Sequence, residues 1–207
     1  VLAGPGTGKT TALVGRFVHL INSGVNANSI LCCTFAKKAA DELSQRIQLE
    51  TGINTRGLPI GTFHSLALRL LKSDGRSIGL EPPSQVLMEK DRLKAIFDIK
   101  KSVNASEIYK DLDKESSRPS NILKYIDEVR EQLLDPEDAS VEASEGGNLV
   151  HIAHAEIYSH YDEWLTQNGK IDFPRMIQWA CKLLISDAAN GSPIASKYKH
   201  ILVDEYQ

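Results

Sequence analysis

The sequence contains few cysteines and no long apolar segment. Three cysteines in 207 residues, two of them adjacent at positions 32 and 33, are too few for the disulfide framework of a secreted protein. No apolar run approaches the ~20 residues of a transmembrane helix, and no segment has the pattern of a signal peptide. Cys32 and Cys33 lie in an apolar stretch, so we expect buried, reduced thiols in a cytosolic protein.

An excess of charge of one sign is also absent, because the formal net charge is only −3. A hydrophobic content of 42% and a charged content of 25% are typical of a globular protein. The charges are nevertheless unevenly distributed. Residues 1–72 carry eight Lys and Arg against three Asp and Glu, whereas residues 73–147 carry eleven against seventeen. The basic first third favours a surface that meets a polyanion.

Glycines are concentrated at the beginning of the chain, in the segment AGPGTGKT at residues 3–10. Glycines at 4, 6 and 8 let the backbone turn tightly and direct its N–H groups at a polyphosphate, and the helix that follows adds its positive dipole end. Lys9 would contact the β- and γ-phosphates, and the Thr10 hydroxyl would bind Mg²⁺. Ala3 replaces the Gly with which the strict pattern begins. The predicted ATP-phosphate site comprises Ala3, Gly4, Pro5, Gly6, Thr7, Gly8, Lys9, Thr10 and Thr11.

Short apolar runs alternate with helical patterns, which predicts an α/β fold with a parallel sheet. We expect strands at 30–35, 57–62 and 200–203, and helices at 13–21, 37–50, 63–72, 89–103, 120–134, 148–167 and 172–186. Residues 135–147 hold five acids and no base, so we interpret them as a solvated loop. Three parts follow: a first part of an ATP-binding core at 1–88, an all-helical insertion at 89–155, and the continued core at 156–207.

Two acids come directly after the last expected strand, at the edge where α/β sheets bind ligands. In P-loop enzymes a carboxylate at this position binds Mg²⁺ together with the hydroxyl of the phosphate-binding loop, and Asp204 is suited to this role. Glu205 is then placed to orient and deprotonate the attacking water. The alternative is a surface turn after an edge strand, and the pairing with Lys9 and Thr10 argues against it.

Three further motifs are similar to those of one family. Residues 33–43, CTFAKKAADEL, followed by Arg46-Ile47, look like its motif Ia; residues 61–66, GTFHSL, look like motif Ib; and residues 204–207, DEYQ, match motif II. With AGPGTGKT as motif I, the chain resembles the UvrD/Rep/PcrA group of superfamily-1 DNA helicases. Asp172-Phe173 also resembles the stretch before motif II, but Pro174-Arg175-Met176 replaces its acidic tail.

The resemblance implies an incomplete RecA-like P-loop core with a helical insertion, and ATP and Mg²⁺ as cofactors. Lys9, Glu205 and Gln207 would be catalytic, with Gln207 coupling the γ-phosphate to DNA. It also implies a single-stranded DNA path formed by Thr34, Phe35, Lys37, Lys38, Thr62, Phe63 and His64. Packing arguments alone favour Phe35 and Phe63 as core residues, and the lysines as a solvated helix face. A metal clip at His151 and His154 lacks a second ligand cluster, so we interpret these histidines as polar positions on a long helix.

The sequence thus predicts the ATP-binding part of a motor that translocates 3′→5′ on single-stranded DNA, in repair or recombination. Its partners would be single strands and single-strand/duplex junctions, with no membrane, in a bacterial-type cytosol. Because the chain starts with Val inside an expected strand and lacks motifs III to VI, we expect a piece of a longer protein that alone neither unwinds DNA nor hydrolyses ATP usefully. The alternatives are a P-loop ATPase that is not a helicase, and a DNA-binding module without activity.

Overall fold

The chain forms two compact units. The computed structural model describes residues 8–103, 105–110 and 112–204. The first unit combines Val1–Leu70 with Leu183–Gln207, and the second comprises Leu71–Lys182. The second unit is wider than the helical insertion expected at 89–155, and the three functional parts predicted above stay a prediction. No helix in the described ranges has the length and apolar character to cross a membrane.

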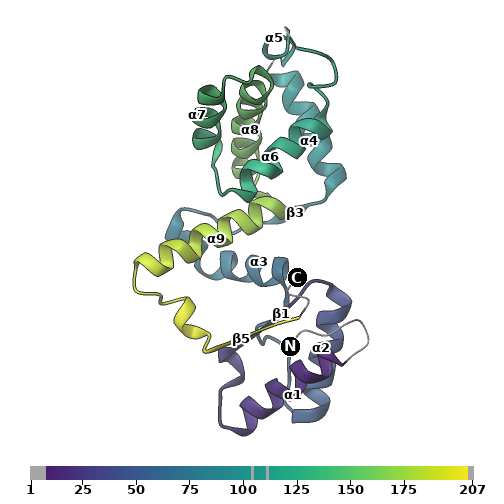
Figure 1. Ribbon diagram of the computed structural model, residues 1–207, viewed down its shortest axis with the longest axis vertical. Helices are drawn as coiled ribbons and strands as arrows, with labels where there is room; N and C mark the ends of the chain where they lie inside the picture. The colour runs from purple at the N-terminus through teal and green to yellow at the C-terminus, as the bar shows by residue number, and fades with distance from the viewer. Residues whose placement is uncertain (1–7, 104, 111, 205–207) are drawn as a thin grey trace. The chain divides into compact units, whose positions relative to one another are not determined.

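The first unit contains a three-stranded parallel sheet in the order β2-β1-β5 (Figure 1). This agrees with the predicted α/β class. Its elements are α1 (Lys9–Asn22), η1 (Ala27–Ser29), β1 (Ile30–Thr34), α2 (Lys37–Thr51), β2 (Ile60–Thr62), the start of α3 (Phe63–Asp74), the end of α9 (Phe173–Ala189), η3 (Ala195–Lys197) and β5 (His200–Val203).

The core of this unit lies between the sheet and its first two helices. From α1, Phe17 is fully buried, and from α2, Ile47 is fully buried; both belong to one cluster with Ile30 and Cys32 of β1. Burial raises the pKa of Cys32 to about 12 and that of Cys33 to about 11. Both thiols are free and stay protonated, as the sequence predicts.

The register of the sheet aligns the carboxyl ends of the three strands. Cys33 of β1 pairs with Gly61 of β2 on one side and with Val203 of β5 on the other. The backbone N–H of Asp204 then donates to the Cys33 carbonyl at 2.8 Å. Residues far apart in the sequence therefore meet at one edge of the sheet.

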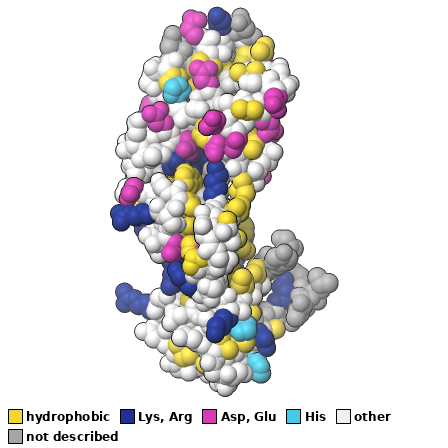
Figure 2. All heavy atoms as spheres, turned by 90° about the vertical axis from the view of Figure 1, so that its left-hand side faces the viewer, with side chains coloured by type: hydrophobic (Ala, Val, Ile, Leu, Met, Phe, Trp, Pro, Cys, Tyr) yellow, Lys and Arg dark blue, Asp and Glu magenta, His cyan; other side chains and the backbone are white. Residues whose placement is uncertain are grey.

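The second unit is mainly helical. It comprises the remainder of α3 and η2 (Gly75–Ile78), then β3 (Gln85–Leu87), α4 (Glu89–Ser102), α5 (Ala105–Ile108), α6 (Pro119–Glu131), α7 (Pro136–Gly146), α8 (Leu149–Gln167), β4 (Lys170–Asp172) and the start of α9. The helices α4, α6, α7 and α8 lie together (Figure 1). Their side chains form one buried cluster. On the face in Figure 2, most acidic side chains lie over this unit and basic side chains dominate the first, as the uneven charge of the sequence indicates.

The prediction of a solvated loop at 135–147 is wrong, because α7 occupies most of this segment. Its first turn is capped by Asp135, whose side chain accepts from the backbone N–H of Asp138 at 3.2 Å, and Pro136 suits the first helical position. Ala139 and Ala143, four residues apart, are buried in the cluster of the second unit. The acids point outward, so charge count alone gave the wrong answer.

A second, two-stranded sheet was not predicted. β3 and β4 pair in parallel, with Val86 opposite Ile171. Each strand has three residues, which is too short for an alternating pattern to be recognised in the sequence. β4 ends at Asp172, and this residue organises the buried polar groups of the unit.

Asp172 is fully buried and accepts hydrogen bonds from two arginines and a tyrosine. Arg130 Nη1 lies 3.0 and 2.9 Å from its two carboxylate oxygens, Arg92 Nε lies 3.1 Å away, and Tyr161 Oη lies 2.8 Å away. The backbone N–H of Arg175 donates to it at 2.9 Å. Burial alone would raise the pKa of Asp172, but the charges of Arg130 and Arg92 outweigh it, so the pKa is lowered.

Replacing Asp172→Asn should destabilise the second unit by about 1.5–3 kcal/mol, because two buried guanidinium groups lose charge-assisted hydrogen bonds, while Arg92 keeps its ion pair with Asp127 and Arg130 keeps its ion pair with Asp162. Since the folded-state pKa lies below the unfolded one, the stabilisation is present at neutral pH and is lost as the pH falls through the folded-state pKa. Denaturant unfolding at several pH values measures both effects. Asp98→Asn, on the exposed face of α4, is the control. A loss below about 1 kcal/mol for Asp172→Asn would contradict the assignment.

Candidate functional site

The amino end of α1 lies at the carboxyl edge of the first unit's sheet, beside Asp204. Gly8 caps the helix with a φ of 84°, a left-handed conformation that favours glycine. Lys9 and Thr10 form the first helical turn and are partly buried, while Thr11 is exposed. The unpaired N–H groups and the dipole of a helix start attract anions. The predicted loop residues 3–7 lie outside the described residues.

Thr10 and Asp204 are in contact although 194 positions separate them. The Thr10 hydroxyl donates to Asp204 Oδ2 at 3.3 Å. Asp204 is only 9% exposed, and its backbone is held by the Cys33 carbonyl. The structure therefore brings together the two residues that the sequence predicts as Mg²⁺ ligands. Glu205 and Gln207 lie outside the described residues.

The chemistry of this pair suits a hard divalent cation. A hydroxyl and a carboxylate are oxygen donors, and Mg²⁺ is typically held by one or two such protein groups together with water and phosphate oxygens. Clusters of three or more His, Cys, Asp or Glu, which would hold a metal by protein ligands alone, are absent from the described residues. The pair thus fits Mg²⁺ that arrives with a nucleotide better than a zinc-type site.

The segment after β1 places predicted DNA contacts at the same edge. Phe35 is 78% exposed, so the packing argument that favoured it as a core residue is wrong. Lys37 and Lys38 open α2 and are exposed. Thr34, in contrast, is 1% exposed, and its hydroxyl has no hydrogen-bond partner among the described residues. The exposed ring could stack on a base and the two ammonium groups could contact phosphates, which is how single-stranded nucleic acids are bound.

The segment after β2 lies beside it in the sheet. Phe63 is 45% exposed, which also contradicts its assignment to the core, and His64 is partly buried. Burial lowers the pKa of His64, so its ring is neutral at pH 7 and offers a hydrogen bond rather than a charge. Thr62 Oγ1 accepts from the backbone N–H of Ser65 at 3.2 Å, which caps α3.

Comparison with known proteins gives the family. Residues 1–207 match the UvrD/REP helicase N-terminal domain. The chain belongs to this family. It is 30% identical to the ATP-dependent DNA helicase PcrA of Staphylococcus epidermidis over 208 aligned positions, which cover 100% of the chain and 27% of that protein. It is 29% identical to the ATP-dependent DNA helicase PcrA of Staphylococcus aureus, again over 100% of the chain and 27% of that protein. The chain thus spans 27% of the length of these relatives.

In this UvrD/REP helicase N-terminal domain, sequence reasoning missed one residue that shapes the site. Ser65 Oγ also donates to the Thr62 carbonyl at 2.9 Å, so two hydrogen bonds join the end of β2 to the first turn of α3. A β-carbon on Gly61 would clash with this Ser65 hydroxyl, so a larger residue there would force the hydroxyl to move. A Thr directly before a helix, whose hydroxyl can accept from the backbone N–H three residues later, is a recognisable helix-start signal.

The histidines of α8 have a structural role. His154 is buried, and its Nε2 lies 2.9 Å from the Ser116 carbonyl. His151 contacts the Tyr125 ring, with centroids 5.2 Å apart. Among the described residues, no group of three or more His, Cys, Asp or Glu that could hold a metal lies at this pair.

Proposed function

We propose that this UvrD/REP helicase N-terminal domain is the RecA-like, ATP-binding part of an ATP-dependent DNA helicase that moves along single strands. The observation that carries the proposal is the contact between Thr10 and Asp204 at the start of α1. A coil-to-helix turn, a hydroxyl and a carboxylate at the carboxyl edge of a parallel sheet are what a P-loop nucleotide site requires. The relatives are named as ATP-dependent DNA helicases, which supports the same activity.

Each residue has a proposed task in the cleavage of the β–γ bond of ATP. Lys9 and the backbone N–H groups of residues 3–10 bind the phosphates and orient the γ-phosphate. Thr10 and Asp204 hold Mg²⁺, which when bound neutralises charge on the phosphate oxygens. Glu205 accepts the proton of the attacking water, and Gln207 relays the state of the γ-phosphate toward the DNA side. Proton acceptance of this kind contributes about 10²–10⁴ in rate.

Single-stranded DNA would run across the same edge of the sheet. Phe35 and Phe63 would stack on bases, Lys37 and Lys38 would contact phosphates, and Thr62 and His64 would add hydrogen bonds. Thr34, predicted beside them, is too buried to reach the DNA strand. The parallel register aligns the ends of β1 and β2, with Thr34 opposite Thr62. The segments that follow β1 and β2 would therefore contact the same single strand of DNA. We propose 3′→5′ translocation, engagement of single-strand/duplex junctions, and a role in repair or recombination in the cytoplasm, in line with the family resemblance.

The 207 residues alone are proposed to be inactive as a motor. In a complete helicase, arginines of a second lobe complete the ATP site and are worth about 10³–10⁵ in rate. Binding, rather than turnover, is therefore the measurement suited to this chain. Unwinding of duplex DNA by the 207-residue chain would contradict this part of the proposal.

Nucleotide binding tests the role of the Thr10–Asp204 pair. We expect a fluorescent, non-hydrolysable ATP analogue to bind the purified protein more tightly with Mg²⁺ than without it. Lys9→Ala should weaken binding about tenfold or more, because a charge-assisted bond to phosphate is lost. Asp204→Asn should remove most of the advantage given by Mg²⁺ while leaving metal-free binding unchanged.

Asp41→Asn, an exposed acid on α2, is the matched control and should behave like the unmodified protein. Equal dependence on Mg²⁺ in Asp204→Asn and in the control would rule out Asp204 as a metal ligand. Circular dichroism of each variant separates a lost site from a lost fold.

Binding of an oligothymidylate tests the DNA path. Phe35→Ala and Phe63→Ala should each weaken binding by about 1–3 kcal/mol, the range measured for one base stacked on an aromatic ring. Phe35 is 78% exposed, so its variant should keep its stability, whereas Phe63 is 45% exposed and its variant should lose some. Fluorescence anisotropy of a labelled strand measures the affinity.

Leu49→Ala provides the matched control, because Leu49 is 85% exposed on α2 and lies outside the motifs. It should bind as the unmodified protein does. If both Phe variants bound the strand as tightly as this control, the DNA path would lie elsewhere, and a P-loop ATPase that is not a helicase would become the better reading.

A further inference from the structure

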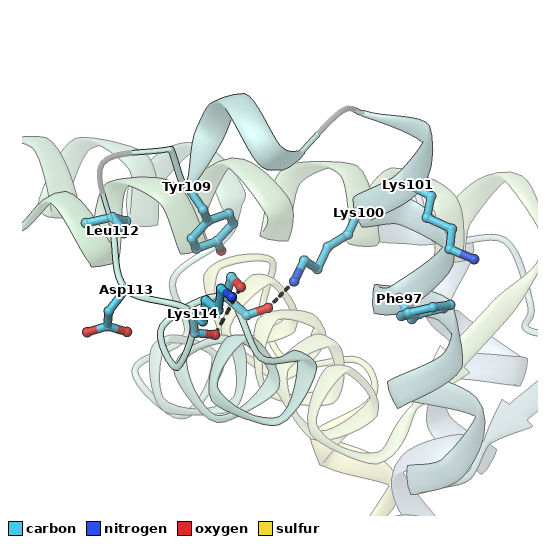
Figure 3. A pocket seen from close by; sticks show the side chains of 8 residues that line it. Phe97, Lys100, Lys101, Tyr109, Leu112, Asp113 and Lys114 are labelled. Carbon is cyan, nitrogen blue, oxygen red and sulfur yellow. Dashed lines mark hydrogen bonds between the residues drawn. The ribbon is translucent and has the colours of Figure 1, made fainter.

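A cavity in the second unit, separate from the site above, has the features of an anion-binding pocket. It has a volume of about 370 Å³ and lies between the last turns of α4 and the segment that follows α5 (Figure 3). A volume of this size is in the range of small-ligand pockets. Its walls are formed by Phe97, Lys100, Lys101, Tyr109, Leu112, Asp113, Lys114 and Ser117.

Three lysines supply the positive charge of the cavity. The Lys100 ammonium group contacts the Ser117 carbonyl, which fixes its position at the wall (Figure 3). Burial lowers the pKa of Lys100, so its charged form is poorly solvated and would gain from an anion nearby. Lys101 lies over the Phe97 ring, 4.2 Å from its centroid. Lys114 is exposed at the rim.

Asp113, the acid among the described residues of the lining, bonds to other partners. Asp113 accepts from the backbone N–H of Ser116 at 2.7 Å and from its hydroxyl at 3.0 Å. In Figure 3 its carboxylate points away from Lys100. Two neighbouring acids pair with bases, Glu107 with Lys110 and Glu115 with Arg118. Among the described residues, Glu156 also acts on the Tyr109 hydroxyl, so the three lysines of the lining stand against Asp113 and Glu156 and leave a small positive excess.

A second and independent feature is the hydroxyl of Tyr109. The residue is 6% exposed, and its Oη has no hydrogen-bond partner among the described residues. Burial raises the pKa of Tyr109 well above its ordinary value, so the group remains a protonated donor. In Figure 3 it points into the space between Lys100 and the segment at Lys114. Because a buried donor without a partner is costly, a ligand that accepts from it would be favoured.

We propose that this cavity binds a terminal phosphate group carried by a nucleotide. A phosphate monoester has a charge of about −1.5 to −2 and three strong acceptor oxygens, which can meet Lys100, Lys114 and the Tyr109 hydroxyl together. Lysine suits phosphate as a point charge. The apolar side chains of Phe97 and Leu112 line the remainder of the cavity and would contact the body of the nucleotide.

Nuclear magnetic resonance titrations of the labelled protein with AMP and with inorganic phosphate test the proposal. We expect saturable shifts at Lys100, Tyr109 and Lys114, and the same shifts in Lys9→Ala, since the proposed ATP site is a different one. Lys114→Ala should weaken AMP binding about tenfold or more, and Tyr109→Phe about threefold or more. Lys94→Ala, on the exposed face of α4 and outside the lining, should bind normally.

The source of the phosphate is distinguished with a short oligothymidylate that does or does not carry a 5′-phosphate. Binding of AMP with no effect of the oligonucleotide end indicates a free nucleotide, and binding that requires the 5′-phosphate indicates a strand end. Equal binding of both oligonucleotides without AMP binding would overturn the proposal, as would the absence of saturable shifts at millimolar AMP.

Stability gives an independent readout of the Tyr109 hydroxyl. Tyr109→Phe should unfold at the same or a higher denaturant concentration than the unmodified protein, because the hydroxyl makes no hydrogen bond within the described structure. A marked loss of stability would mean that the hydroxyl is already satisfied in the free protein, which contradicts its role as a ligand donor.

Discussion

The candidate site depends on the parallel pairing of β5 with β1. The hydrogen bond from the Asp204 N–H to the Cys33 carbonyl, at 2.8 Å, continues this pairing past the end of β5. It places the Asp204 carboxylate beside the Thr10 hydroxyl, and the pairing of β1 with β2 brings the Phe35 and Phe63 segments to the same edge. A shift of β5 by one residue would turn Asp204 to the opposite face of the sheet and separate the pair. Such a shift would also withdraw Leu202 of β5 from the buried cluster against which it packs.

Much of this fold could be predicted from the sequence, because its main elements carry strong periodic signals. The apolar run at β1 and the helical spacing in α1, α2 and α8 indicated their positions. The segment of α7 was missed because its acids suggested solvent, whereas its two buried alanines carry little hydrophobic signal. β3 and β4 were missed because three-residue strands depend on a partner far along the chain. The exposure of Phe35 could not be predicted from the apolar residues next to it in the sequence. Its ring is exposed because β1 ends at Thr34, and the sequence does not show where the strand ends.

The second unit is organised by buried charges rather than by apolar packing alone. Asp172 with Arg92 and Arg130 forms a network in which every buried charge has an opposite partner. The family resemblance had singled out Asp172 and left the following Pro-Arg-Met tail without an explanation. Arg175 of that tail supplies a backbone N–H to Asp172 and an ion pair to Asp162 at 2.8 Å, so the departure from the acidic pattern adds a cation to the same network. Sequence alone could not reveal this, since the partners are spread over α4, α6 and α8.

In the proposed function, the first helix and the last strand of this chain share one metal–nucleotide site. Paramagnetic Mn²⁺ in place of Mg²⁺ reports on this site, because Mn²⁺ broadens the amide signals of nearby residues. With an ATP analogue and Mn²⁺, we expect simultaneous broadening at Gly8–Thr10 and at Val203–Asp204, while signals of α7 stay sharp. Broadening at only one of these two segments, or at neither, would mean that the two segments do not bind the same metal.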